Sequence, residues 1–170
     1  MEIRKAAVTD AKDVAKVQVD SWHSTYKNIV PDEYLNNMSY ESREEKWKEI
    51  ISSQPVYVAE NDDGKIIGFS NGGAERTGKY PAFGGELYAI YILKEHQRKG
   101  LGKQLLAPIL QELRVKSVYS MLVLVLEDND ASFFYEHLGA EKVDTVEIEI
   151  AGKKLKEVVY GWKDIREIPI

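Results

Sequence analysis

The chain has no cysteine among its 170 residues. This absence excludes disulfides, thiolate metal sites and a cysteine nucleophile. Long hydrophobic runs are absent too, since segments such as Met121 to Leu126 are too short to cross a bilayer. The first residues contain no apolar stretch of signal-peptide length. We therefore expect a cytoplasmic protein with no membrane partner.

Basic residues are also fewer than acidic ones, with 23 Lys and Arg against 28 Asp and Glu, so the formal net charge is −5 at pH 7. This balance argues against nucleic acid as the main partner. It does not argue against a small anionic ligand, since salt screens distant surface charges beyond about 8–10 Å and the local field decides binding. The three histidines, His23, His96 and His137, do not have metal-ligand spacing, so no metal is expected.

Apolar periodicity predicts strands and helices that alternate along the chain. The sequence Asn61-Asp62-Asp63-Gly64 is typical of a hairpin turn, and Gly139 is typical of a helix end. We predict strands at 3–5, 56–60, 66–74, 86–93, 119–126, 141–150 and 154–162. Helices or helical turns are predicted at 10–22, 31–35, 40–51, 101–116 and 129–138. The pattern indicates one α/β domain over residues 1–170.

A loop with two closely spaced glycines lies between the strand at 86–93 and the helix at 101–116. Its residues are Gln97, Arg98, Lys99, Gly100, Leu101, Gly102 and Lys103. Backbone N–H groups in such a loop, together with the positive end of the helix dipole, favour a phosphate group. The loop lacks the Lys-Ser or Lys-Thr of a nucleoside-triphosphate loop, and glycines that only permit a tight helix entry remain an alternative.

A second segment, Asn129 to Ala140, has helical spacing. Ala131, Phe134, Tyr135 and Leu138 fall at i, i+3, i+4 and i+7 and so share one face. On this pattern alone a core aromatic is the favoured interpretation of Tyr135, and a helix cap is the alternative for Asn129.

Together the two segments resemble the GNAT superfamily of acetyl-CoA-dependent N-acetyltransferases. The loop from Gln97 to Gly102 is similar to the Gln/Arg-x-x-Gly-x-Gly/Ala signature of that family. The segment from Asn129 to Ala140 is similar to its Asn-x-x-Ala-x-x-Phe-Tyr signature, although Ala140 stands where an aromatic residue is usual. The resemblance covers about residues 2–162. It implies a mixed, mostly antiparallel sheet of about seven strands flanked by about four helices.

The resemblance also implies roles for individual residues. The cofactor would be acetyl-CoA, released as CoA, with its diphosphate on the backbone of the loop from Gln97 to Lys103. Its pantetheine arm would lie along Ile90, Tyr91 and Ile92. Asn129 would contact that arm, and the Tyr135 hydroxyl would lie near the sulfur.

Acetyl transfer to an amine needs a proton acceptor, because an alkyl ammonium has a pKa near 10 and arrives protonated. It also needs an acid for the departing thiolate, and a phenol such as Tyr135 can supply it. Glu86, at the start of the central strand, is the candidate base. A strand-end carboxylate in water is the competing interpretation of Glu86.

For the acceptor, the resemblance places one wall of the site between the first two helices. The available aromatic residues are Trp22, Tyr26 and Tyr34, with Tyr88 opposite, and aromatic rings suit a cationic amine. Packing of Trp22 and Tyr26 beneath the helices is the alternative.

We therefore predict an N-acetyltransferase that acts on a primary amine, of a small molecule or a peptide, by direct attack in a ternary complex. A catalytically silent acyl-CoA sensor and a nucleotide-binding module are the competing functions. The last hairpin is a possible homodimer contact.

Overall fold

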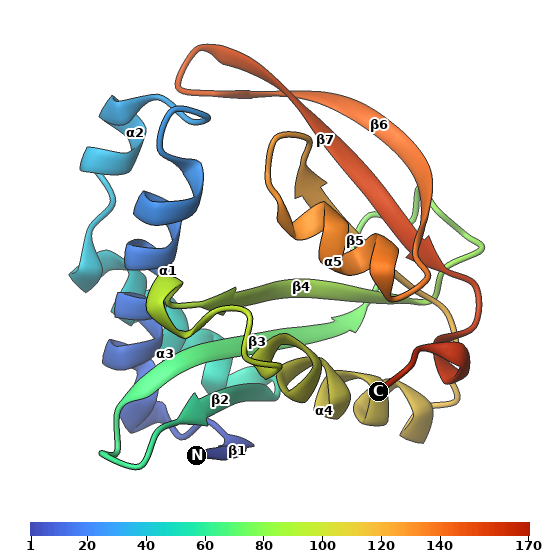
Figure 1. Ribbon diagram of the computed structural model, residues 1–170, viewed down its shortest axis with the longest axis horizontal. Coiled ribbons are helices and arrows are strands. Elements are labelled where there is room, and N and C mark those ends of the chain that lie inside the picture. Colours follow the sequence, from blue (N-terminus) through green and yellow to red (C-terminus); the bar gives the residue numbers. More distant parts are fainter.

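The computed structural model describes residues 1–170 and contains one seven-stranded sheet with five α-helices (Figure 1). The strands lie in the order β1-β2-β3-β4-β5-β7-β6, and every neighbouring pair is antiparallel except β4 and β5. The strands are β1 (Glu2–Lys5), β2 (Val56–Glu60), β3 (Ile66–Ala74), β4 (Gly85–Ile92), β5 (Met121–Leu126), β6 (Glu141–Ile150) and β7 (Lys153–Trp162). The helices are α1 (Ala11–Tyr26), α2 (Asp32–Asn36), α3 (Tyr40–Ser53), α4 (Leu101–Val115) and α5 (Ala131–His137).

The predicted fold class is confirmed, with small shifts at element ends. The helix expected to end near Trp22 continues for another turn to Tyr26. The helical turn predicted at 31–35 forms a short helix of its own, α2, so the sheet has five helices where about four were expected. Gly139 follows α5 with a φ of 93°, a left-handed conformation that suits glycine at a helix end.

Neighbouring residues of β3 show which helices cover which face of the sheet. The Phe69 ring lies 4.8 Å from the ring of Trp47 in α3, whereas the Ser70 hydroxyl donates to the Leu105 carbonyl oxygen in α4 at 2.7 Å. Successive side chains of a strand point to opposite faces, so α3 and α4 cover opposite faces. The Trp47 indole donates to Gln18 of α1 at 2.8 Å, which joins α1 to α3. We name these the α1 face and the α4 face.

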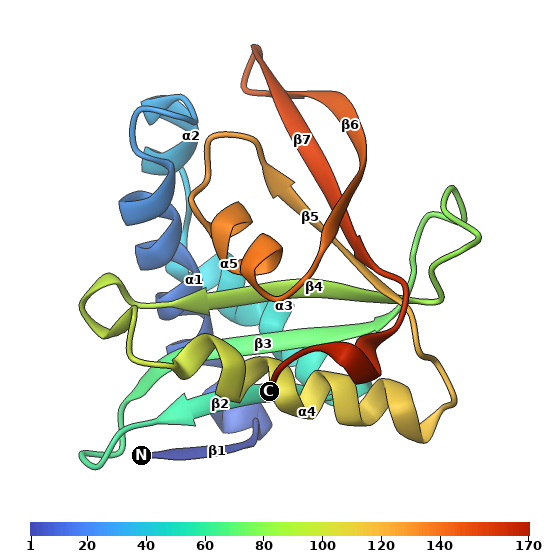
Figure 2. The same ribbon diagram turned by 45° about the vertical axis from the view of Figure 1, so that its right-hand side comes forward.

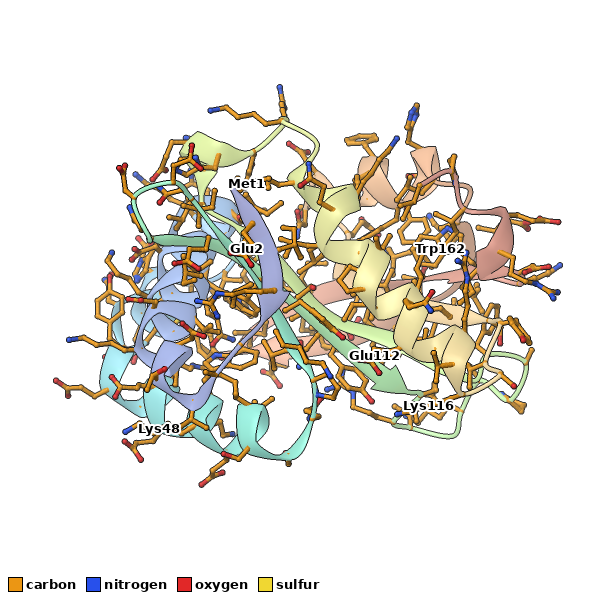
Figure 3. All side chains as sticks on the ribbon, turned by 90° about the horizontal axis from the view of Figure 1, so that it is seen from below. Met1, Glu2, Lys48, Glu112, Lys116 and Trp162 are labelled. Carbon is orange, nitrogen blue, oxygen red and sulfur yellow. The ribbon has the colours of Figure 1, made fainter.

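The α4 face is covered through an apolar stripe. Leu101, Leu105, Ile109 and Leu113 recur at helical spacing and are all buried, as their pattern predicts. Each such side chain contributes about 1.5–3 kcal/mol when fully buried. Figure 3, seen from below, shows α4 running under the sheet, with Glu112 and Lys116 labelled toward its C-terminal end. This packing fixes the N-terminal end of α4, where the glycine loop enters it.

The parallel pair β4 and β5 is hydrogen-bonded at one end alone. Residues 85–87 of β4 pair with 121–123 of β5, and the pairing stops there. Beyond that point β5 continues as the antiparallel partner of β7, and Figure 2 shows it diverging from β4. The rest of β4 therefore has a hydrogen-bonded neighbour, β3, on one side alone.

A bulge in β4 lies next to this divergence. Asn71 of β3 is opposite Ala89 and Gly72 is opposite Leu87, so Tyr88 is the extra residue. Gly72 is required here, because a Cβ atom would lie 2.7 Å from the carbonyl oxygen of Glu86. The extra residue lets Glu86 and Tyr91 share a face although they are five residues apart.

The β6–β7 hairpin packs against the loop between α1 and α2. The Lys153 ammonium donates to the Ile29 carbonyl oxygen at 2.7 Å, which connects the hairpin tip to that loop. Beneath this contact lies a small apolar cluster made by Tyr26, Val30, Leu35, Leu126 and Leu155. None of the helices combines the length and the apolar composition that a membrane span requires.

Candidate active site

The glycine loop presents unpaired backbone donors at the start of α4. Arg98 and Gly100 have positive φ angles of 61° and 83°, which turn the chain sharply into the helix. None of the N–H groups from Arg98 to Lys103 donates to another atom of the chain. Free donors at the N-terminus of a 15-residue helix, beside basic side chains, fit the diphosphate of a CoA molecule.

Two other loop residues have structural contacts. The Gln97 side-chain amide donates to the Ile92 carbonyl oxygen at 3.0 Å and so closes the loop onto the end of β4. A Cβ atom on Gly102 would lie 2.9 Å from the ring of Phe134 in α5. Gly102 therefore permits close contact between α4 and α5, in addition to any contact that its N–H group makes with a ligand.

The edge of β4 toward β5 is open where the sequence analysis placed the pantetheine arm. Ile90, Tyr91 and Ile92 pair with β3 on one side and have no strand partner on the other. An extended amide-containing chain can hydrogen-bond to such an edge as an added strand would.

Three tyrosine side chains from different elements lie near the divergence of β4 and β5. Tyr26 comes from α1 and Tyr91 from β4, while Tyr135 comes from α5 on the α4 face. Burial is the main cause that raises the pKa of all three hydroxyls, and each lies close enough to affect another. The site is therefore approached by phenols from both faces of the sheet.

Tyr135 is only 5% exposed. Its ring meets Trp162 edge-on at 6.0 Å, and its hydroxyl makes no hydrogen bond within the chain. The raised pKa keeps this hydroxyl protonated at neutral pH, so it retains a proton to donate. The sequence pattern allowed Tyr135 to be a core residue or a functional one. Its burial and its contact with Trp162 show that its ring is part of the core.

Asn129 uses both ends of its side-chain amide. Its oxygen accepts from the Ala131 N–H at 2.9 Å, and its nitrogen donates to the Tyr26 hydroxyl at 3.1 Å. Asn129 therefore satisfies a backbone donor at the start of α5, although the N-cap position itself is taken by Asp130. The amide nitrogen has a second hydrogen, which is free to contact a ligand.

Glu86 is a buried carboxylate paired with Arg76, whose side chain is 58% exposed. Glu86 is 2% exposed, and Arg76 donates to it from its Nη2 at 2.6 Å, its Nε at 3.2 Å and its backbone N–H at 3.1 Å. The interpretation of Glu86 as a strand-end carboxylate in water is therefore wrong. The Arg76 guanidinium also lies over the Tyr88 ring, 4.2 Å from its centre. Breaking such a pair would leave a buried charge uncompensated.

The four aromatic residues predicted for the acceptor wall divide into two groups. Trp22 lies 4.4 Å from Tyr26 and 6.0 Å from Tyr34, measured between ring centres. Tyr88 lies apart from them, with Arg76, and its hydroxyl donates to the Ala74 carbonyl oxygen. Tyr26 is buried in an apolar cluster, and Trp22 and Tyr34 pack against that cluster, as the packing alternative expects. Their role as an acceptor wall stays a prediction, and Tyr88 belongs to the Glu86–Arg76 side.

Unsatisfied polar atoms lie on the α1 side of the molecule. The buried Ser21 hydroxyl, the Trp22 indole N–H and the Asn71 side-chain oxygen have no hydrogen-bond partner. Buried polar atoms normally have partners, so these are candidates for contact with water or a ligand.

Two residues of this region, Arg76 and Glu157, belong to no motif of the sequence and were not predicted. Arg76 lies in a glycine-containing loop, and no pattern links it to Glu86. The sequence indicates only weakly that Glu157 points inward: it lies two residues from Leu155 and from Val159, and so on the same face of β7 as these buried residues. No group of three or more side chains that could hold a metal ion is present.

Comparison with known proteins agrees with this geometry. The sequence model of the acetyltransferase (GNAT) family matches residues 19–140. A Bacillus subtilis (strain 168) protein named "Uncharacterized N-acetyltransferase YuaI" is 44% identical over 163 residues, which cover 96% of this chain and 93% of that protein. The chain belongs to the GNAT family and is an N-acetyltransferase of the acetyl-CoA-dependent class.

Two more distant matches, a curated sequence and a solved structure, come from Thermoplasma acidophilum. One is a spermidine N(1)-acetyltransferase, 27% identical over 150 residues, covering 85% of this chain and 89% of that protein. The other is the crystal structure of PaiA N-acetyltransferase in complex with coenzyme A. It has a TM-score of 0.72 and 26% identity, and the match covers 92% of this chain and 96% of that one.

Proposed function

We propose that this protein transfers the acetyl group of acetyl-CoA to a primary amine by direct attack within a ternary complex. The observation that supports this most strongly is the position of Tyr135. Its unpartnered hydroxyl lies with Tyr91 and Tyr26 where β4 diverges from β5. The free backbone donors from Arg98 to Lys103 follow the C-terminal end of β4, at the start of α4.

In this proposal the loop backbone holds the diphosphate, and the open edge of β4 from Ile90 to Ile92 pairs with the pantetheine arm. Asn129 contributes its free amide hydrogen to that arm. Holding amine and thioester together supplies a large part of the rate enhancement. Tyr135 donates its proton to the thiolate as the C–S bond breaks.

The sequence predicted Glu86 as a base that acts through water. Its ion pair with Arg76 limits that role. One carboxylate oxygen of Glu86 accepts two hydrogen bonds from the guanidinium, and the other accepts the Arg76 backbone N–H. A carboxylate oxygen has two lone pairs, so a single lone pair of Glu86 is free to accept a proton.

For the acceptor we propose a small molecule that carries a cationic amine. The cluster of Trp22, Tyr26 and Tyr34 supports this, because aromatic faces attract cations. The named activity of the spermidine N(1)-acetyltransferase relative supports it as well.

We further propose that residues 1–170 act as one catalytic domain, which is supported by the continuous sheet. A cytoplasmic location stays a prediction. A homodimer also stays a prediction. What supports it is that β6 is an edge strand and most of its residues are exposed.

The test is to incubate the protein with acetyl-CoA and a panel of primary amines and diamines, and to identify products by mass spectrometry. We expect a singly acetylated amine, and initial rates that depend on both substrates as in a ternary complex. Tight binding of acetyl-CoA without acetylation of any amine would instead support the acyl-CoA sensor.

A further inference from the structure

Glu157 occupies a position on β7 where an apolar side chain would be expected. Its cross-strand partner is Leu126 at the end of β5, so both side chains lie on the α1 face. Two residues away along β7 on the same face, Leu155 packs in the cluster that contains Tyr26. On its other side, Val159 packs with Leu122. Glu157 therefore lies on the α1 face between these two apolar clusters.

The same face carries Glu86. Leu122, the apolar neighbour of Val159, is the register partner of Glu86 in the parallel part of the β4–β5 pair. The bulge in β4 places Tyr91 on this face too, where its ring lies 5.7 Å from Phe69. Glu157 is thus on the same side of the sheet as the Glu86–Arg76 pair and as the tyrosines at the divergence of β4 and β5.

Glu157 is half-buried, and its carboxylate makes no ion pair or hydrogen bond. This contrasts with Glu86, whose oxygens are occupied by Arg76. A half-buried carboxylate without a partner has its lone pairs available, and it is unfavourable unless a cation or a proton joins it.

Charged and titratable groups around Glu157 come from several elements. Burial raises the pKa of Glu157, the charge of Glu86 raises it further, and Arg76 lowers it. Glu157 in turn raises the pKa of Tyr91 on β4. It does the same to Tyr80, whose hydroxyl donates to Asp144 of β6 at 2.8 Å. Glu157 is therefore within electrostatic range of both Tyr91 and the Glu86–Arg76 pair.

We propose that Glu157 receives the ammonium group of the acceptor and takes up one of its protons before attack on the thioester, while Glu86 stays paired with Arg76. This inference rests on the proposed function and names the base and the charge of the acceptor. The ammonium gives one proton to Glu157 and becomes a neutral amine. The amine nitrogen then bonds to the acetyl carbon as the C–S bond breaks. The thiolate takes its proton from Tyr135, the nitrogen loses a second proton that restores Tyr135, and Glu157 returns its proton to solvent.

The experiment compares wild type, Glu157→Gln and Glu149→Gln. Glu149 is an exposed carboxylate of the same hairpin without an ion-pair partner, so its change is a matched loss of charge. We measure kcat/KM for the amine as a function of pH, with acetyl-CoA saturating. Calorimetric binding of CoA to each variant shows that the site is intact.

We expect Glu157→Gln to lower kcat/KM by about 10²-fold near neutral pH while CoA affinity is unchanged. The deficit should shrink as the pH approaches the amine's pKa, near 10, because neutral amine then arrives without needing a base. Glu149→Gln should behave as wild type.

Two results would overturn the inference. One is a Glu157→Gln profile that matches wild type at all pH values. The other is a Glu86→Gln variant that loses activity near neutral pH and recovers it at high pH, together with a Glu157→Gln variant that loses no activity. In either case wild type still acetylates amines, so the proposed function survives. If wild type acetylates no amine, the proposed function itself fails.

Discussion

The side-chain amide of Asn129 donates a hydrogen bond to the Tyr26 hydroxyl at 3.1 Å and so joins two residues 103 positions apart. The sequence analysis gave these residues separate tasks, Asn129 toward the cofactor arm and Tyr26 toward the acceptor. The structure makes them one contact between α1 and the loop before α5. The end of α1 is thereby tied to the part of the site where the thioester is proposed to lie.

Tyr26→Phe tests this contact. Removing the hydroxyl frees the Asn129 amide, and a typical hydrogen bond contributes about 0.5–1.5 kcal/mol. We expect the KM for acetyl-CoA to rise by about two- to tenfold, with a smaller change in kcat. Steady-state kinetics with varied acetyl-CoA measure this effect. An unchanged KM would show that the Asn129–Tyr26 contact does not orient Asn129 toward the cofactor.

Tyr135→Phe tests the proposed acid. The ring packing against Trp162 is kept, and the proton donor is lost. We expect kcat to fall by about 10²–10⁴-fold with nearly unchanged CoA affinity, as measured by thiol release and calorimetry. Equal turnover in the variant and wild type would remove Tyr135 from the mechanism.

Gly102→Ala tests the contact between α4 and α5. The added Cβ atom would meet the Phe134 ring at 2.9 Å, and overpacking of this kind costs about 1–3 kcal/mol. We expect a lower melting temperature and weaker CoA binding, because the loop must shift. Phe134→Leu in the same chain should restore part of both by making room. Failure of the double variant to recover would place the defect in the ligand site instead.

Gly100→Ala should act differently. Nothing lies within 4 Å of a Cβ atom at Gly100, whereas its φ of 83° strains any other residue. We expect a loss of roughly 1 kcal/mol in the free energy of unfolding from strain alone. Chemical denaturation measures it. Phe134→Leu should not restore stability to Gly100→Ala, and a recovery as large as that in Gly102→Ala would contradict this distinction.

The pH dependence of stability gives a test of Glu157 that does not use activity. Its pKa is raised in the folded protein, so its contribution to stability is complete below the unfolded value of about 4.3 and is lost as the pH rises through the folded value. Glu157→Gln should therefore raise the melting temperature at about pH 8, and the gain should shrink toward about pH 5. Glu149→Gln is the control. A gain in melting temperature that is the same at all pH values would show that ionised Glu157 does not destabilise the folded protein.

Most of the fold could be predicted from the sequence, because its signals are local. The apolar stripe from Leu101 to Leu113 and the glycine after α5 define their helices without reference to the rest of the chain. The partner of Glu86 could not be predicted. Arg76 lies ten residues away, and the contact depends on the course of the loop between β3 and β4. Glu157 was missed because its surroundings come from strands far apart in the sequence.

The most direct test of the central claim is the rate of CoA-thiol release by wild type with saturating acetyl-CoA, with and without a primary diamine. The account predicts a low rate without amine and a rate that rises to saturation with it. It also predicts that Tyr135→Phe abolishes this rise. Release that does not depend on any amine, or that is the same in Tyr135→Phe, would contradict the account.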